Sequence, residues 1–246
     1  MDALLMCGGR GTRLGGDTEK PLVRVADRPM VDRVIAALAA SRIDRVRAVV
    51  SPHATATREH LAERAVGTDS RLPLRVVDAP GDGYVADLRY ALGDAESAAD
   101  PDVDPTISPP VLTVAADLPL LDGEVVDRVI DAAAAVESAS LTVCVPAARK
   151  RELGVSADGA FEADGRSVVP AGINAVGGVD ADENDDGRGD SEHDTGRDDT
   201  DADPDESDDA LRVTTDRRIA VNVNYPSDVR IAEALLRSDH SQTPPP

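Results

Sequence analysis

A glycine-rich segment near the N-terminus carries the strongest chemical signal in the sequence. Gly8, Gly9 and Gly11 follow a short apolar run, and Arg13 and Lys20 come soon afterwards. Glycines allow a backbone to approach a phosphate closely and to point its N–H groups at the oxygens. Arginine can bridge two phosphate oxygens, and lysine supplies a compact positive charge. The glycine spacing fits neither the dinucleotide fingerprint nor the P-loop, so the segment predicts a phosphate site of a third kind.

Further polar residues accompany two other apolar runs. Asp117 comes just after the apolar residues 111–115, so its carboxylate is expected at the end of a strand. A hard oxygen ligand in that place suits Mg²⁺, which would bridge the carboxylate and substrate phosphates. In the simpler alternative, Asp117 caps the next turn. Asn222 and Asn224 are one strand period apart and are expected to face the same side, although either could instead be a turn residue before Pro226.

The elements that must position these residues alternate between strand-like and helix-like patterns. The strand-like runs are at residues 3–7, 46–50, 74–77, 111–115, 141–145 and 219–223. The helix-like runs are at residues 29–40, 54–65, 84–92, 123–136 and 227–236. This order is typical of an α/β fold, here a three-layer, mainly parallel twisted sheet of Rossmann-like type with helices on both faces. Ligands of such sheets bind beyond the carboxyl ends of the strands, which nominates residues 7–20, 78–84 and 116–119.

Two stretches interrupt this order. Residues 99–110 hold four prolines and three aspartates and are expected to form a surface loop. Residues 180–209 hold 16 acidic residues, two arginines and no apolar residue except alanine. Such a segment cannot bury enough surface to offset its chain entropy, so it predicts a disordered acidic insertion. We therefore expect a single domain formed by residues 1–178 and 211–237, followed by a mobile tail at residues 238–246.

The charge composition indicates a protein from a salt-rich cytoplasm. The net charge is −21, and only two of the 26 basic residues are lysines, Lys20 and Lys150. An aspartate-rich surface with almost no lysine suits concentrated salt, which also screens a triphosphate from the acidic surface. An acidic protein of an ordinary cytoplasm is the alternative. No run approaches the roughly 18 apolar residues of a membrane helix, no basic leader precedes residues 3–7, and Cys7 and Cys144 are expected to be buried thiols in a reducing compartment.

The N-terminal segment also resembles a known signature. A strand, then Gly-Gly-x-Gly-x-Arg, then Lys20-Pro21-Leu22 is similar to the pattern of the sugar-nucleotide and cofactor nucleotidyltransferases. Within this superfamily, three further segments resemble the archaeal GTP:adenosylcobinamide-phosphate guanylyltransferases of cobalamin synthesis, at residues 78–88, 169–174 and 222–228. The resemblance covers most of the expected domain. The acidic insertion departs from the compact form that is usual in that family.

The resemblance implies a role for each matching residue. The residues expected to contact the nucleotide are Cys7, Gly8, Gly9, Gly11, Thr12, Arg13, Lys20, Asp78, Gly83 and Tyr84. Those expected to contact the acceptor are Gly172, Ile173 and Asn174. A metal ion, Mg²⁺, would be held by Asp117 together with Asn222 or Asn224. Catalysis would depend on Arg13, Lys20 and Asp117.

The activity that the resemblance implies is transfer of GMP from GTP to adenosylcobinamide phosphate, which gives adenosylcobinamide-GDP and pyrophosphate. A phosphomonoester, with a second pKa of about 6, is already an anionic nucleophile at neutral pH, so no catalytic histidine or glutamate is needed. The alternatives are a molybdenum cofactor guanylyltransferase, a sugar-phosphate nucleotidyltransferase and, outside the enzymes, a nucleotide-sensing protein whose acidic tract binds a partner. No nucleic acid and no membrane span is expected, and a homodimer is one option for an oligomeric state that the sequence leaves open.

Overall fold

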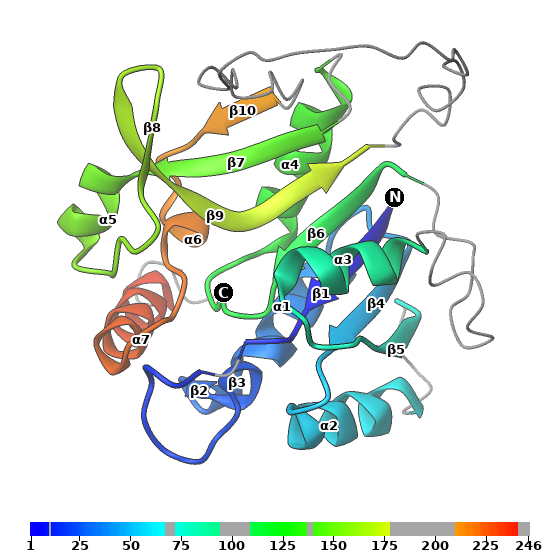
Figure 1. Ribbon diagram of the computed structural model, residues 1–246. Helices are drawn as coiled ribbons and strands as arrows, with labels where there is room; N and C mark the ends of the chain where they lie inside the picture. Colours follow the sequence, from blue (N-terminus) through cyan, green and yellow to red (C-terminus); the bar gives the residue numbers. More distant parts are fainter. Residues whose placement is uncertain (10, 67–71, 94–108, 137–139, 178–209, 241–246) are drawn as a thin grey trace, which may run out of the picture.

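One sheet of eight strands forms the centre of the fold (Figure 1). The computed structural model describes residues 1–9, 11–66, 72–93, 109–136, 140–177 and 210–240. Within these residues the strand order is β10-β7-β9-β6-β1-β4-β5, and β8 pairs with the beginning of β9. The sheet is therefore mixed, and its parallel and antiparallel parts lie side by side.

Four parallel strands form the first part of the sheet. The central strand β1 (Asp2–Met6) lies between β4 (Arg45–Val50) and β6 (Val111–Ala115), and β5 (Leu74–Asp78) pairs with the far side of β4. The inner strands are almost continuously apolar because both of their faces are buried. Since these strands are parallel, their carboxyl ends meet at one edge, as the sequence pattern predicts.

The antiparallel part extends this edge. β9 (Arg166–Val176) pairs antiparallel with both β6 and β7 (Ser140–Pro146). β8 (Phe161–Ala163) folds back on β9 as a hairpin, and β10 (Ala210–Val213) runs parallel to β7. Because β9 pairs with β6 only through residues 173–176, its first half projects beyond the carboxyl end of β6. The β8–β9 hairpin therefore lies at the same edge as the loops of the parallel strands.

Helices cover both faces of the sheet, as Figure 1 shows. The main apolar core joins the sheet to α1 (Met30–Ala39), α2 (Thr55–Val66) and α4 (Gly123–Ala134). On the opposite face, α3 (Tyr84–Leu92) packs against β1 and β4. The predicted α/β architecture, with a mainly parallel sheet between helices, is confirmed.

A separate apolar cluster supports the end of the glycine-rich segment. It joins α7 (Pro226–His240) to the two-stranded ribbon of β2 (Arg24–Val25) and β3 (Arg28–Pro29). The shorter elements nearby are the 3₁₀ helix η1 (Lys20–Leu22), α5 (Ala147–Leu153) and α6 (Arg217–Ala220). In the described parts of the chain, no helix is both long and apolar enough to cross a membrane.

The structure corrects two expectations near the C-terminus. The strand predicted at residues 219–223 is wrong, because its first residues end α6, whose start is capped by the Asp216 side chain. Residues 221–223 have no regular secondary structure and belong to no ladder. α7 continues to His240, so residues 238–240 are helical rather than the start of a tail. The insertion predicted at residues 180–209 and most of the loop predicted at 99–110 lie outside the described residues.

Candidate active site

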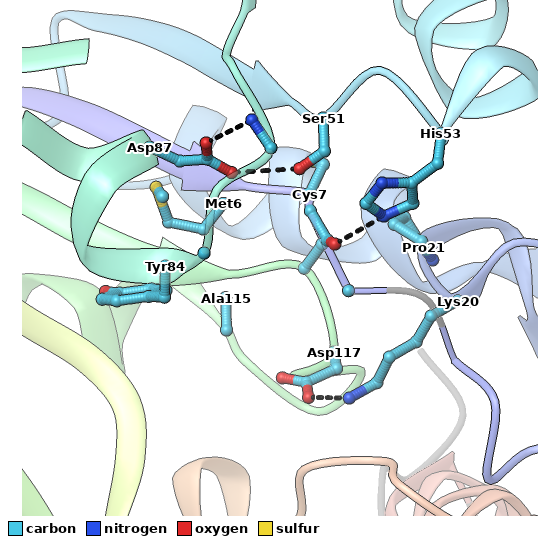
Figure 2. Close-up of a pocket in the computed structure, with 15 residues that line it drawn as sticks. Met6, Cys7, Lys20, Pro21, Ser51, His53, Tyr84, Asp87, Ala115 and Asp117 are labelled. Atoms are coloured by element: carbon cyan, nitrogen blue, oxygen red, sulfur yellow. Dashed lines mark hydrogen bonds and ion pairs between the residues drawn. The ribbon is translucent and has the colours of Figure 1, made fainter. Parts of the chain in front are cut away.

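A pocket of about 380 Å³ opens at the carboxyl edge of the parallel strands (Figure 2). It lies among the ends of β1 and β6, the loop after β4 and the start of α3. Its lining residues are Met6, Cys7, Gly8, Gly9, Lys20, Pro21, Ser51, His53, Gly81, Gly83, Tyr84, Asp87, Ala115, Ala116 and Asp117. All three segments that the sequence nominated, residues 7–20, 78–84 and 116–119, contribute residues to this lining.

Two glycines of the N-terminal segment stand where a side chain would not fit. A Cβ at Gly8 would lie 2.4 Å from Ser51 Oγ, so this backbone passes directly against the loop after β4. Gly11 has a φ of +63°, and a Cβ there would lie 2.9 Å from Lys20 Cβ. These glycines therefore let the segment turn tightly around Lys20 and stay close to the loop after β4, and their close approach to a phosphate stays a prediction.

We expect Gly8→Ala to lower the melting temperature by about 3–10 °C, because overpacking costs about 1–3 kcal/mol in a domain of this size. The added methyl group must displace the Ser51 hydroxyl. Gly9→Ala is the matched variant, since its Cβ would meet only the flexible Lys20 side chain, at 3.4 Å. Thermal unfolding of both variants provides the measurement. Equal melting temperatures would show that the approach at Gly8 is not a constraint.

Lys20 joins two of the predicted metal ligands. Its Nζ donates to Asp117 Oδ2 at 2.6 Å and to Asn224 Oδ1 at 2.8 Å. The Lys20 and Asp117 side chains are only 16% and 13% exposed, so this ion pair is poorly screened by solvent. The structure thus brings together one cation, one carboxylate and one amide at one end of the pocket, from three segments that are far apart in the sequence.

A short network fixes the position of this cluster. The backbone N–H of Val223 donates to the Asp117 carbonyl at 3.0 Å, which ties the segment after α6 to the loop after β6. The fully buried Asp228 carboxylate accepts the N–H groups of Asn224 and Tyr225, each at 2.9 Å. It also accepts the backbone N–H and the hydroxyl of Ser156, each at 3.0 Å. Asn224 is therefore held rigidly, although residues 221–223 form no strand.

Asn222 meets a different lysine. Lys150 is only 1% exposed, and its Nζ donates to the Ala220 carbonyl at 2.8 Å and to Asn222 Oδ1. Burial lowers the pKa of Lys150, although Asp117, Asp228 and Asp158 act in the opposite direction. The expectation that the two asparagines face one common site is therefore not met: Asn224 binds Lys20, whereas Asn222 binds Lys150.

The lowered pKa of Lys150 predicts a pH dependence of stability. Between the lowered pKa and the ordinary value of 10.5, the unfolded chain holds a proton that the folded chain releases. The free energy of unfolding therefore gains a contribution that increases with pH in that window. We expect this contribution to be absent in Lys150→Met, as measured by urea unfolding between pH 8 and pH 10.5. Parallel pH profiles of the two proteins would contradict it, since all other titrating groups are shared.

The cluster offers one free carboxylate oxygen to a divalent cation. Among the described residues, Asp117 Oδ1 is buried and has no hydrogen-bond partner. No group of three or more histidine, cysteine, aspartate or glutamate side chains suited to a metal occurs in the same residues. Mg²⁺ usually binds through one or two carboxylates together with waters and substrate phosphates, so a single oriented oxygen fits it. Asn224 would first have to release Lys20, and Asn222 is held by Lys150.

Several residues expected at the nucleotide lie outside the pocket lining. Arg13 NH1 pairs with Asp158 Oδ2 at 3.0 Å, and its guanidinium lies 6.0 Å from the ring centroid of Tyr225. Asp78 forms a two-pronged pair with Arg58, at 2.7 and 2.8 Å, and its side chain is exposed. Thr12 is an exposed turn residue, and Gly11 contacts Lys20. Cys7 lines the pocket, but its side chain points into the core, where burial raises the pKa of its thiol to about 12.

The residues expected at the acceptor lie on β9. A Cβ at Gly172 would lie 4.0 Å from Asp117 Oδ1, and the φ of Gly172 is +79°. A Cβ there would also lie 3.2 Å from Ala115 Cβ, so this glycine lets the β9 backbone pass close to the end of β6, beside the carboxylate. The Ile173 side chain is fully buried in the core, and Asn174 Oδ1 accepts the Val143 N–H at 3.2 Å. Of these three residues, only Gly172 lies beside the cluster of Lys20, Asp117 and Asn224.

The structure adds polar residues that the sequence reasoning missed. Ser51 and His53 follow β4, and His53 Nε2 is 3.0 Å from the Gly8 carbonyl, an acceptor to which it would donate. Asp87 lies inside α3 and lines the pocket. Glu19 accepts the N–H groups of the first turn of α2, which anchors the segment that carries Lys20. The edge rule applied to the end of β4 would have identified Ser51 and His53, but nothing in the local sequence marks Asp87.

Comparison with known proteins places this site in a family. The sequence model of the MobA-like NTP transferase domain matches residues 3–171. The chain belongs to this family and is a nucleotidyltransferase, which argues against the non-enzymatic alternative. Nucleotidyltransferases of this family generally use a divalent metal ion.

Individual relatives agree with this assignment. The chain is 25% identical to adenosylcobinamide-phosphate guanylyltransferase of Methanocaldococcus jannaschii, over 97% of this chain and 99% of that protein. This match confirms the resemblance noted in the sequence. A 66-residue segment is 39% identical to the bifunctional protein GlmU of Carboxydothermus hydrogenoformans, covering 27% of this chain and 15% of that protein.

Solved structures show the same fold. The structure of 4-diphosphocytidyl-2C-methyl-D-erythritol synthase from Anaerococcus prevotii is similar, with a TM-score of 0.55, 13% identity, and coverage of 96% of this chain and 97% of that one. A putative glucose-1-phosphate thymidylyltransferase from Bacillus anthracis has a TM-score of 0.51 at 12% identity, with 72% of this chain and 71% of that one covered.

Proposed function

We propose that this chain transfers GMP from GTP to adenosylcobinamide phosphate in cobalamin biosynthesis. The observation that carries the proposal is the cluster of Lys20, Asp117 and Asn224 beside the backbone of Gly172. A nucleotidyl acceptor must reach the α-phosphate next to the cation, and the β9 backbone at Gly172 borders this cluster. The name of the relative that matches nearly the full chain supports this choice of substrates.

The shape of the pocket supports one orientation of the nucleotide. The triphosphate would lie along the backbone of Gly8 and Gly9 with Lys20 at its α-phosphate. The base would lie toward Gly83 and Tyr84, at the start of α3. Arg13 would join the phosphates after leaving Asp158. That change is inexpensive, because an exposed ion pair contributes only about 0–1 kcal/mol.

The reaction would be an in-line displacement at the α-phosphorus. A terminal phosphate oxygen of the acceptor forms the new P–O bond, and the bond to the β-phosphate breaks, so pyrophosphate carries away the electron pair. No proton has to be removed from the acceptor, because its phosphate is already anionic. The chain's own contribution is therefore positioning, together with stabilisation of the growing negative charge by Lys20 and Arg13.

We propose Mg²⁺ as the divalent cation, held by Asp117 Oδ1 and supplying further positive charge to the phosphates. Asn224 is the asparagine that can join it, because its side chain already reaches the same lysine as Asp117. Asn222 would act at a distance, through its bond to Lys150.

The proposal is tested first by nucleotide binding and then by transfer. Calorimetric titration in high salt with GTP, ATP, CTP and UTP, with and without Mg²⁺, should give tight binding of GTP alone. Transfer of labelled GMP should then occur to adenosylcobinamide phosphate and not to molybdopterin or a sugar phosphate. Preference for another triphosphate would overturn guanylyl transfer, and transfer to molybdopterin would replace the acceptor while keeping the nucleotide.

The placement of the lysines supports a salt-rich cytoplasm as the setting. Both lysines of the chain point into the fold, and the other basic residues are arginines. Lysine has therefore been retained at two internal positions where a compact ammonium group makes specific hydrogen bonds. This pattern supports selection against lysine on the surface.

A further inference from the structure

A buried carboxylate lies at the end of the pocket away from the cation. Asp87, on α3, is only 4% exposed and lines the pocket. Its Oδ2 accepts the Ser51 hydroxyl at 3.0 Å, and its Oδ1 accepts the Gly81 N–H at 2.8 Å. Both donors are neutral groups, and no ion pair of Asp87 with a cationic side chain occurs among the described residues. A buried carboxylate without a cation costs free energy, so its presence in a ligand pocket calls for a function.

The charge of Asp87 and its distance from Lys20 argue against a role at the phosphates. Figure 2 shows Asp87 and Ser51 on the opposite side of the pocket from Lys20 and Asp117. A carboxylate close to a triphosphate would repel it, particularly where burial weakens solvent screening. Asp87 borders the first glycine of the segment, Gly8, and its Oδ1 is bonded to Gly81, so it lies on the side of the pocket toward Gly83 and Tyr84 that we propose for the base. It therefore faces the part of a nucleotide that is uncharged, which is the base.

Counting the described residues only, Asp87 uses about half of its hydrogen-bonding capacity. A carboxylate offers about four lone-pair positions, and the two bonds described above occupy one on each oxygen. The two that remain can accept a pair of parallel donors. Guanine presents such a pair on one edge, its N1–H and its 2-amino group. Adenine places an unprotonated nitrogen at the same position, and its lone pair would face the carboxylate without a proton between them.

We propose that Asp87 selects guanine by accepting the N1–H and the 2-amino group of the base. This inference rests on the proposed use of GTP and adds the residue that distinguishes GTP from ATP. Ser51 and Gly81 hold the carboxylate in place, because each donates to a different oxygen. Discrimination arises because a wrong base leaves buried polar groups unsatisfied, which is a far stronger penalty than a change in apolar contact.

The Asp87→Asn variant tests the proposal while preserving the local structure. The asparagine oxygen can still accept the Gly81 N–H, and its amide can donate to the Ser51 hydroxyl. We expect the wild-type protein to bind GTP more tightly than inosine triphosphate, which lacks the 2-amino group, and ATP least tightly. In Asp87→Asn, GTP affinity should fall at least tenfold, and the ratio between GTP and ATP should shrink by a similar factor or more. Asp131→Asn is the matched control, because it makes the same change at an exposed carboxylate on α4 outside the pocket lining, and it should keep the wild-type order of the three nucleotides.

A measurement without any variant guards against misfolding. The wild-type protein is titrated with N1-methyl-GTP, which cannot donate from N1 and should bind about as weakly as ATP. Equal affinities for GTP, inosine triphosphate and N1-methyl-GTP would overturn the role of Asp87, as would a folded Asp87→Asn variant with unchanged selectivity. A wild-type protein that binds GTP no better than ATP would instead overturn guanylyl transfer itself, so the two failures are distinguishable.

Discussion

The Lys20→Ala variant is expected to lose about 10²–10³-fold in turnover while it keeps its fold. Lys20 is the cation of the cluster and donates to both Asp117 and Asn224. In the transferring state, negative charge grows on the α-phosphate and on the departing pyrophosphate, and this ammonium group is placed to stabilise it. Because the charge is largest in the transition state, turnover should fall more than GTP affinity does.

The measurement for Lys20 compares steady-state transfer with calorimetric binding. Arg24→Ala is the control, because it removes a positive charge only four residues away at an exposed position. Circular dichroism and thermal unfolding verify that both variants fold. If Lys20→Ala turned over at the wild-type rate, the ammonium group would have no part in the reaction, and the cluster would be structural only.

The Asp117→Asn variant is expected to lose about 10³-fold in turnover at low Mg²⁺, by analogy with the loss of a group that stabilises transition-state charge. The replacement keeps an oxygen that can accept from Lys20 but removes the negative charge from a site with one buried, unsatisfied oxygen. The affinity for the cation should therefore fall, and added Mg²⁺ should restore part of the activity.

Turnover measured across a Mg²⁺ titration separates this role from a purely structural one. The Asp127→Asn variant changes a half-buried carboxylate on α4 that pairs with Arg42, and its Mg²⁺ response should match that of the wild type. If Asp117→Asn and the wild type respond to Mg²⁺ with the same midpoint, Asp117 does not hold the cation. The Lys20 and Asp117 effects should also not add, since the two side chains form one ion pair.

The sequence predicted the parts of the site that depend on chain topology. Apolar runs separated by helix-like segments require a parallel sheet, and a parallel sheet brings the carboxyl ends of its strands to one edge. For that reason the sequence alone places Gly8, Lys20 and Asp117 at one edge of the sheet. The glycine at position 8 was predicted to allow close approach to a phosphate; the structure shows in addition that only a residue without a side chain fits there against Ser51.

Choices among long polar side chains could not be predicted in the same way. Arg13 and Asp78 each have partners close in space but distant in sequence, Asp158 and Arg58, and local patterns do not reveal them. The apolar residues at 219–223 suggested a strand, but their spacing is equally compatible with the end of a short helix. Asp87 looks like an ordinary polar residue of an amphipathic helix, and only the fold turns it toward the pocket.

The inward position of both lysines gives this protein an unusual chemical property. Apart from the amine of the first residue, the chain offers a reagent for primary amines only Lys20, which is 16% exposed at the pocket, and Lys150, which is fully enclosed. Reductive methylation or acylation would therefore modify Lys20 ahead of Lys150. The extent of Lys20 modification, measured by mass spectrometry, would decrease as a ligand occupies the pocket. Because the surface carries arginine rather than lysine, Lys20 is the one accessible lysine amine of the chain and lies at the pocket. Its modification would therefore measure ligand binding without an engineered label.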